Sequence, residues 1–129
     1  MTKISNEYGQ WLSEFNWSHI VTIRLHYKLT ELQSYNLGQR IINCSKNISR
    51  LFYSVEKDRQ DNMNHMHLII ESMNPKLTRK QLANDAGFGN YVNAVSYFQK
   101  ADSKRAVSNY CSKYVGKPEV YHDYLEAKK

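Results

Sequence analysis

Hydrophobic and polar residues alternate with a period of two along several short stretches of the chain. This alternation is typical of strands that have one buried and one exposed face. The stretches are residues 19–25, 51–57 and 65–71, and residues 91–98 are predicted to form another strand. Because residues 58–64 are mostly polar, we expect the second and third strands to form an antiparallel hairpin with a long loop.

Apolar residues at helical spacing lie between the predicted strands. The first such set predicts an amphipathic helix through the forties. Its members are Leu37, Ile41, Cys44 and Ile48. Thr78 and Gln81 have the spacing of a capping box, which predicts a short helix that Gly87 and Gly89 would end. A last helix is predicted over residues 103–115.

The predicted order of strand, helix, strand, strand, helix, strand and helix indicates an α+β fold. We expect a central, mostly antiparallel sheet of about four or five strands flanked by helices. At 129 residues the chain has room for one domain. Its core is expected over residues 18–117, followed by a C-terminal tail, residues 118–129, that caps the core or mediates self-association.

Composition and charge narrow the class of partner. Apolar residues make up 41% and charged residues 23% of the chain, as in folded globular proteins. The formal net charge of +6 favours a polyanion such as nucleic acid. Cys44 and Cys111 are too few and too far apart for a disulfide scaffold. No stretch approaches the roughly 20 apolar residues that cross a bilayer, so we expect a soluble intracellular protein with no membrane partner.

Two histidines and a glutamate form the first candidate site. On the strand over residues 65–71, His65 and His67 project to one face, because side chains two residues apart do so. If the apolar residues of the preceding strand face the core, Ser54 and Glu56 share the face of the histidines. Two imidazoles and a carboxylate suit a divalent cation such as Mg²⁺ or Mn²⁺. The competing interpretation is a pair of surface histidines beside a glutamate.

The last predicted helix carries the second candidate site. Tyr110, Lys113 and Tyr114 are at positions i, i+3 and i+4, so one helical face offers two phenols and an ammonium group. A phenol can attack a phosphodiester when its proton is lost or shared and the phosphorus is made electrophilic. A metal ion and a nearby cation can perform these tasks. The competing interpretation is an amphipathic helix whose tyrosines only pack.

Taken together, the two sites resemble the motifs of the HUH endonucleases, in particular the rolling-circle replication initiators (Rep proteins) of small DNA viruses, phages and plasmids. The second motif of that family is matched by residues 65–70, with the acidic Glu56 on the preceding strand. The third motif is matched by Tyr110-x-x-Lys113. The predicted strand over residues 19–25 sits where the family has its first, weaker motif. The resemblance spans about residues 18–117.

The resemblance implies a ferredoxin-like or RRM-like HUH nuclease fold, with His65, His67 and Glu56 on a Mg²⁺ or Mn²⁺ ion. The implied substrate is single-stranded DNA or an origin hairpin. Tyr110 would attack the phosphodiester to give a 5′-phosphotyrosine and a free 3′-OH, and the reverse step would join strands without ATP. Such a nicking and joining reaction initiates rolling-circle DNA replication.

The remaining residues of the tyrosine helix take supporting roles under this resemblance. Lys113 would stabilise charge on the phosphate or steer the phenol. Tyr114 would be either a second nucleophile or a residue that packs or stacks on a base. Phe52 and Ile69 lie on the predicted metal-bearing face, so we expect the Tyr110 helix to cover them.

Basic and aromatic residues supply a surface for the DNA strand. Tyr91 and Tyr97 are available for base stacking. The basic candidates for phosphate contacts are Arg24, Lys104, Arg105 and Lys117. No ATP-binding loop of the Gly-x-x-x-x-Gly-Lys type occurs, so unwinding would need a separate helicase as partner. We expect the protein to act in the cytoplasm of a host cell, with a homodimer as one possible state.

Two alternatives stay open. A single-tyrosine HUH transposase would form a stable dimer on a DNA hairpin, whereas the Tyr-x-x-Lys pattern and Glu56 favour an initiator. A nonenzymatic DNA-binding regulator on the same fold would not need the metal and tyrosine residues. The presence of His65, His67, Glu56 and Tyr110 together argues against the regulator.

Overall fold

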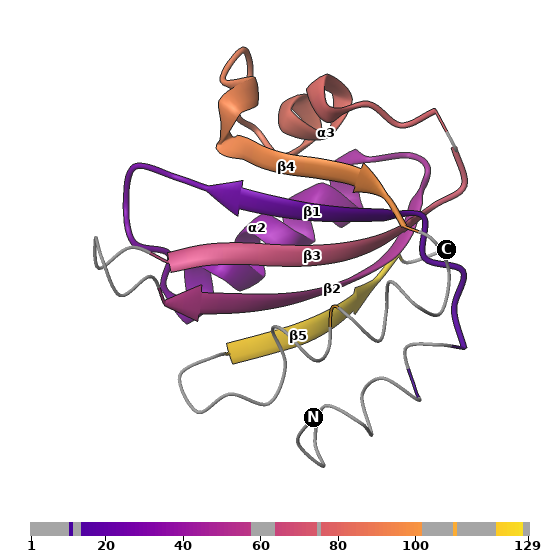
Figure 1. The fold of residues 1–129 in the computed structure, drawn as a ribbon, viewed down its shortest axis with the longest axis horizontal. Helices are drawn as coiled ribbons and strands as arrows, with labels where there is room; N and C mark the ends of the chain where they lie inside the picture. The colour runs from indigo at the N-terminus through magenta and orange to yellow at the C-terminus, as the bar shows by residue number, and fades with distance from the viewer. Residues whose placement is uncertain are drawn as a thin grey trace.

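One antiparallel sheet forms the centre of this protein (Figure 1). The computed structural model describes residues 11, 14–57, 64–74, 76–101, 110 and 121–127. The strands are β1 (His19–Arg24), β2 (Ile48–Lys57), β3 (Asn64–Ser72), β4 (Val95–Lys100) and β5 (Tyr121–Glu126). They follow the order β4-β1-β3-β2-β5, and each neighbouring pair is antiparallel.

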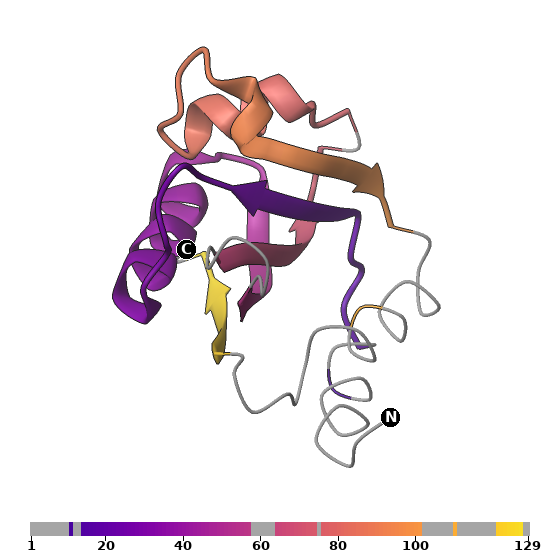
Figure 2. The ribbon, with the colours of Figure 1, turned by 60° about the vertical axis from the view of Figure 1, so that its left-hand side comes forward.

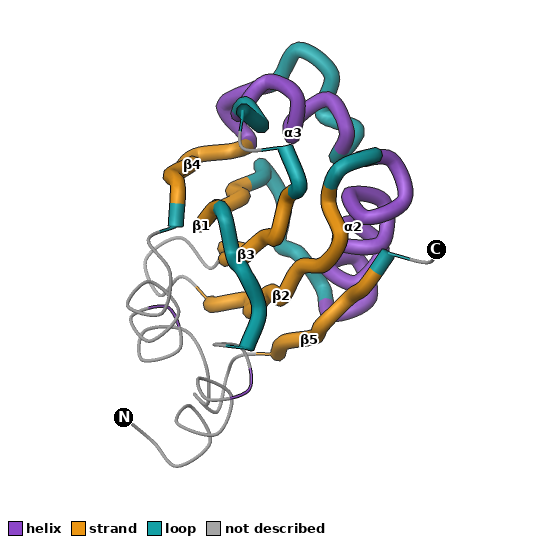
Figure 3. The backbone as a smooth tube through the Cα atoms, turned by 90° about the vertical axis from the view of Figure 1, so that its right-hand side faces the viewer, coloured by secondary structure: helices purple, strands orange, loops and turns teal. Residues whose placement is uncertain are grey.

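Helices cover one face of the sheet, as Figure 3 shows. These helices are α2 (Glu31–Cys44) and α3 (Arg79–Asp85). Their buried residues pack in one hydrophobic cluster with alternate residues of the inner strands. The result is the predicted α+β fold with an antiparallel sheet, in an arrangement consistent with the ferredoxin-like class. No helix in the part of the chain described here is long and apolar enough to span a bilayer.

Helix α2 differs in its bounds from the predicted helix through the forties. A capping box opens it, in which the Thr30 hydroxyl accepts from the Gln33 backbone N–H and the Gln33 side chain accepts from the Thr30 backbone N–H. The helix ends at Cys44, and Ile48 is the first residue of β2. The helical spacing of Ile48 was therefore misleading, because this residue is buried as part of a strand.

Helix α3 confirms the capping box predicted at Thr78 and Gln81. The chain leaves the helix through Gly87 and Gly89, whose φ angles of 90° and 59° favour glycine.

The strand predicted over residues 91–98 begins later and ends later. Residues Val92–Ala94 form a short 3₁₀ helix, η1, and β4 begins at Val95. The physical reason is the length of its partner. Strand β4 lies at the edge and pairs with β1, and the pairing ends at Ile23 opposite Val95.

Strand β5 lies within residues 118–129, which were predicted to form a tail outside the core. It pairs with β2 at the edge of the sheet opposite β4, as Figure 2 also shows. Its Leu125 is buried in the core beneath α2. The folded core therefore extends past residue 117, and its last strand comes from the predicted tail.

The face of the sheet opposite the helices carries a second hydrophobic cluster. Its buried members are Trp17, Phe52, Ile69 and Tyr110. The backbone at Tyr110 is helical, while the rest of the helix predicted over residues 103–115 lies outside the described residues. The Tyr110 helix was predicted to cover Phe52 and Ile69, and of that helix Tyr110 itself packs in one cluster with both residues.

Candidate active site

A row of polar side chains crosses the sheet on the face that Tyr110 covers. The register pairs Thr22 of β1 with His67 of β3, His67 with Ser54 of β2, and Ser54 with His122 of β5. Directly paired residues of an antiparallel sheet point to the same face. We call Thr22, His67, Ser54 and His122 the histidine row. The edge strand β4 adds Tyr97 opposite Thr22.

A second row of paired residues lies beside the histidine row and consists of Arg24, His65 and Glu56. His65 pairs with Arg24 on one side and with Glu56 on the other. The register therefore confirms that Glu56 shares the face of the two histidines. The histidines are almost fully buried, whereas the side chain of Glu56 is 38% exposed. Among these three side chains, the Glu56 carboxylate is therefore the one that solvent reaches.

His67 is held from two sides. Its Nε2 lies 3.2 Å from Oε2 of Glu56, and its Nδ1 lies 3.0 Å from Oγ1 of Thr22. A neutral imidazole carries one N–H. When Nε2–H donates to Glu56, Nδ1 accepts from the Thr22 hydroxyl; when Nε2 binds a cation instead, Nδ1–H donates to the same oxygen. A hydroxyl performs either role, so Thr22 can orient the ring in both states.

The donor set fits a divalent cation in its chemistry. One carboxylate and two imidazoles on neighbouring strands offer an oxygen and two nitrogens while leaving open positions for substrate. The His65 and His67 rings lie with centroids 6.4 Å apart and almost perpendicular. Within the described ranges, no group of three or more His, Cys, Asp and Glu side chains is already arranged to hold a metal ion. A cation would take the place of the direct contact between Glu56 and His67.

Tyr110 brings its hydroxyl to the histidine row. The side chain is 2% exposed, and its ring meets Phe52 edge-on with centroids 6.1 Å apart. The hydroxyl donates to the backbone oxygen of His67 and lies 3.1 Å from Oγ of Ser54. The phenol oxygen and the candidate metal ligands are therefore joined through the same residue, His67.

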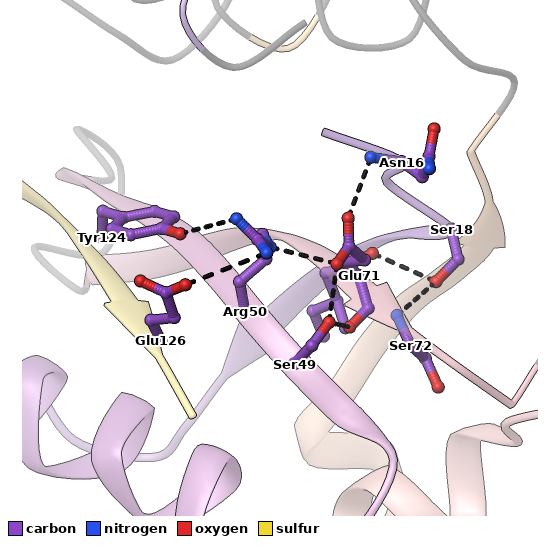
Figure 4. Close-up of polar contacts among 9 residues, drawn as sticks. Asn16, Ser18, Ser49, Arg50, Glu71, Ser72, Tyr124 and Glu126 are labelled. Atoms are coloured by element: carbon purple, nitrogen blue, oxygen red, sulfur yellow. Dashed lines mark hydrogen bonds and ion pairs between the residues drawn. The ribbon is translucent and has the colours of Figure 1, made fainter. Parts of the chain in front are cut away.

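A polar network closes the other end of this face (Figure 4). Glu71 accepts from the backbone N–H of Asn16, from the hydroxyl of Ser49 and from Nε of Arg50 at distances of 2.9, 2.7 and 3.0 Å. Arg50 also donates to the hydroxyl of Tyr124 on β5 at 3.0 Å. The network fixes the segment before β1 and the edge strand β5 to the middle of the sheet.

Burial lowers the pKa of two histidines. Desolvation lowers the pKa of His122, and the neighbouring Asp123 carboxylate partly opposes this shift. Desolvation also lowers the pKa of His19, and the charge of Lys100 adds to it. His19 lies on the helix face of β1, since it alternates with Ile20 and shares the parity of Val21. His19 is therefore a buried core histidine and not part of the candidate site.

Sequence reasoning missed the roles of Thr22 and His122 in the row. Thr22 was visible as a polar residue on the exposed side of the first predicted strand. Its pairing with His67 could not be predicted, because this pairing depends on the order of the strands in the sheet. His122 gave no signal, because β5 was not predicted.

The candidate DNA-binding and helper residues are only partly within the described ranges. Arg24 is exposed beside His65, and Tyr97 is 46% exposed on the same face. Tyr91 stacks on His26 with ring centroids 5.2 Å apart. The residues that lie outside the described ranges are Lys104, Arg105, Lys113, Tyr114 and Lys117. Comparison of the chain with protein-family models, curated proteins and solved structures gives no match.

Proposed function

We propose that this protein cuts and rejoins single-stranded DNA through a covalent link to Tyr110, in a reaction that depends on a divalent metal. The observation that carries the proposal is the position of the phenol. Its oxygen contacts Ser54 and the backbone of His67, on the same face as Glu56 and His65. This contact supports the proposal, because it brings the candidate nucleophile to the face of the sheet that carries the candidate metal ligands.

Glu56, His65 and His67 would hold Mg²⁺ or Mn²⁺ in this proposal. When bound, the ion would polarise the scissile phosphate and neutralise charge that develops on its oxygens. Thr22 would keep the His67 ring oriented through Nδ1.

Tyr110 would attack the phosphorus atom of the scissile phosphodiester. The bond between the phenol oxygen and phosphorus forms, and the bond to the 3′-oxygen breaks with its electron pair on that oxygen. The products are a 5′-phosphotyrosine and a free 3′-OH after proton uptake from water. The ester conserves the energy of the broken bond, so the 3′-OH of another strand can reverse the step. Lys113 would assist at the phosphate, and Tyr114 would either act as a second nucleophile or stack on a base.

Single-stranded DNA or an origin hairpin would approach from the open side of the site. Arg24 and Tyr97 are exposed on the same face as the candidate ligands and offer a guanidinium group for phosphate and a ring for a base. Lys104, Arg105 and Lys117 would add to this basic surface. In the cell the reaction would start rolling-circle replication in the host cytoplasm, with a separate helicase as partner and a homodimer as a possible state.

The direct test is covalent capture. The protein is incubated with labelled single-stranded oligonucleotides and Mn²⁺, and a species that survives a denaturing gel is sought. We expect an adduct that EDTA suppresses and that Tyr110→Phe abolishes while DNA binding persists. The exposed Tyr35 of α2 lies among residues that cover the other face, so Tyr35→Phe is the matched control and should retain the adduct. An adduct that persists in Tyr110→Phe would reassign the nucleophile.

A wild-type protein that binds the oligonucleotides without an adduct, across metals and sequences, would instead support a DNA-binding regulator. A stable dimer that prefers a hairpin and forms the adduct there would support a transposase.

A further inference from the structure

The hydrogen bonds of Tyr110 can be assigned by counting hydrogens. A phenol has one hydrogen to donate, and the backbone oxygen of His67 can only accept. The Tyr110 hydroxyl therefore uses its hydrogen on His67. In the 3.1 Å contact between the two hydroxyl oxygens, Ser54 must then be the donor and Tyr110 the acceptor.

We propose that Ser54 is a further catalytic residue, whose hydroxyl donates to the Tyr110 oxygen and holds that oxygen over the histidine row in position for attack. This inference rests on the proposed function of Tyr110. It adds to that function a residue that touches the reacting atom.

Ser54 is well placed for this role. It is fully buried in β2, with β3 on one side and β5 on the other. Its paired neighbours are His67 and His122, so its hydroxyl lies in the middle of the histidine row. A hydrogen bond between groups removed from water is electrostatically stronger than the same bond at the surface. The short side chain also leaves the hydroxyl little freedom to move, in contrast with a lysine or an arginine.

The His67 carbonyl and the Ser54 hydroxyl differ in what happens to their contacts with the phenol oxygen during attack. As the bond from this oxygen to phosphorus forms, the phenolic proton leaves to water, and the contact with the His67 carbonyl is lost because it needs that proton. Donation from Ser54 needs only a lone pair on the phenol oxygen. Of these two groups, Ser54 is the one that can hold the oxygen before, during and after the transfer, and again when the 3′-OH reverses the step.

The kinetic test compares three substitutions at this position. In single-turnover adduct formation with Mn²⁺ and a labelled oligonucleotide, Ser54→Ala should lower the rate at saturating DNA by about 100-fold, as expected when a reacting group loses the contact that positions it. The DNA concentration for half-maximal rate should not change. Ser54→Cys keeps the size but donates weakly, so it should behave like alanine, while Ser54→Thr keeps the hydroxyl and should recover most of the rate.

Ser34→Ala is the matched control. Ser34 is equally buried, and its hydroxyl donates to the backbone oxygen of Thr30 within α2, on the helix side of the sheet. This variant loses a buried hydroxyl without touching Tyr110 and should keep the wild-type rate. A wild-type rate in Ser54→Cys, or an equal loss in Ser34→Ala, would overturn the role of Ser54.

A second measurement needs no metal. In EDTA, the unfolding free energies of Ser54→Ala, Tyr110→Phe and the double variant form a cycle, and a contact between the two hydroxyls should make the single effects non-additive. Additive effects would overturn the inference even where an adduct forms. Coupling without any adduct in the wild type would refute the proposed function, and with it the catalytic role of Ser54, while leaving the contact in place.

Discussion

Thr22 and Tyr110 show how single residues determine what His67 can do. Three of its polar atoms are engaged at once: Nδ1 with Thr22, Nε2 with Glu56 and the backbone oxygen with Tyr110. One residue therefore links the candidate nucleophile with the candidate metal ligands. Changes at these contacts should alter metal binding and nucleophile position separately, because different atoms of His67 are involved.

Thr22→Val should weaken metal binding. Valine has nearly the shape of threonine but leaves Nδ1 of His67 without its partner, and loss of such an outer contact typically lowers metal affinity by about 10- to 100-fold. The measurement is a Mn²⁺ titration followed by electron paramagnetic resonance. Thr22→Ser keeps the hydroxyl and should bind Mn²⁺ nearly as the wild type does. Equal losses in the valine and serine variants would show that packing, not the hydroxyl, is responsible.

His19 should make the fold sensitive to acid. Burial, together with Lys100, lowers its pKa in the folded state below the ordinary value of 6.5. Between the lowered pKa and 6.5 the unfolded chain binds more protons, so stability rises with pH in this window and falls as the solution is acidified through it. His122 contributes with the same sign.

The measurement is the change in Tm between pH 7.5 and pH 5.5. In His19→Asn this change should be smaller than in the wild type, because asparagine does not titrate. His26→Asn replaces an exposed histidine and serves as the control. An unaltered pH dependence in His19→Asn would contradict this account.

At the scale of the elements, the close approach of α2 to β5 sets the shape of the core. A methyl group on Gly38 would lie 2.6 Å from Cδ1 of Leu125 and 3.4 Å from the Tyr53 ring. Leu125 is 7% exposed and packed in the core, so its side chain cannot simply turn into solvent. Gly38 therefore allows the edge strand and the helix to meet.

Gly38→Ala should destabilise the fold. Alanine favours the helix by about 1 kcal/mol over glycine, whereas overpacking a core costs about 1 to 3 kcal/mol. We expect a net loss of about 1 kcal/mol in urea unfolding. Leu125→Val lacks Cδ1, so in that background Gly38→Ala should raise the stability instead. A loss of the same size in both backgrounds would mean that the clash is not with Leu125.

The elements also show which parts of the fold and site were accessible to sequence reasoning. Alternation along β2 and β3 sets which residues face the core, and this local pattern was enough to place Glu56 with His65 and His67. The capping box at Thr78 is also a local signal and was confirmed. These features depend on residues close together in the chain.

Other features depend on pairing across long distances in sequence. Strand β5 pairs with β2 although Leu125 lies 74 positions after its partner Leu51, as loop closure at such length permits. No alternation of apolar and polar residues within this segment was used to predict the strand. The place of Thr22 beside His67 required the strand order, and the true start of α2 was hidden because Ile48 continued the helical spacing by coincidence.

At the scale of the whole molecule, the two faces of the sheet are buried by different parts of the chain. Helices bury one face, and the second hydrophobic cluster buries part of the other, with Tyr110 inside it. The phenol is 2% exposed while the Glu56 side chain is 38% exposed, so under the proposed function DNA would enter past Glu56. The Glu71 network holds the far end of this cover in place.

Glu71→Gln should loosen that cover. The substitution keeps the shape but removes the charge from hydrogen bonds with Arg50, Ser49 and the backbone of Asn16, and hydrogen bonds to charged groups contribute about 1.5 to 3 kcal/mol. We expect faster amide hydrogen exchange in residues 14–17 and in β5, because Asn16 and the Tyr124 partner of Arg50 belong to these segments.

Glu126→Gln is the comparison, since Glu126 lies 3.9 Å from Arg50 and is 59% exposed. An exposed ion pair contributes little to stability, so Glu126→Gln should barely change the amide hydrogen exchange. Equal exchange in the two variants, or faster exchange spread evenly over the sheet, would contradict a local role for Glu71.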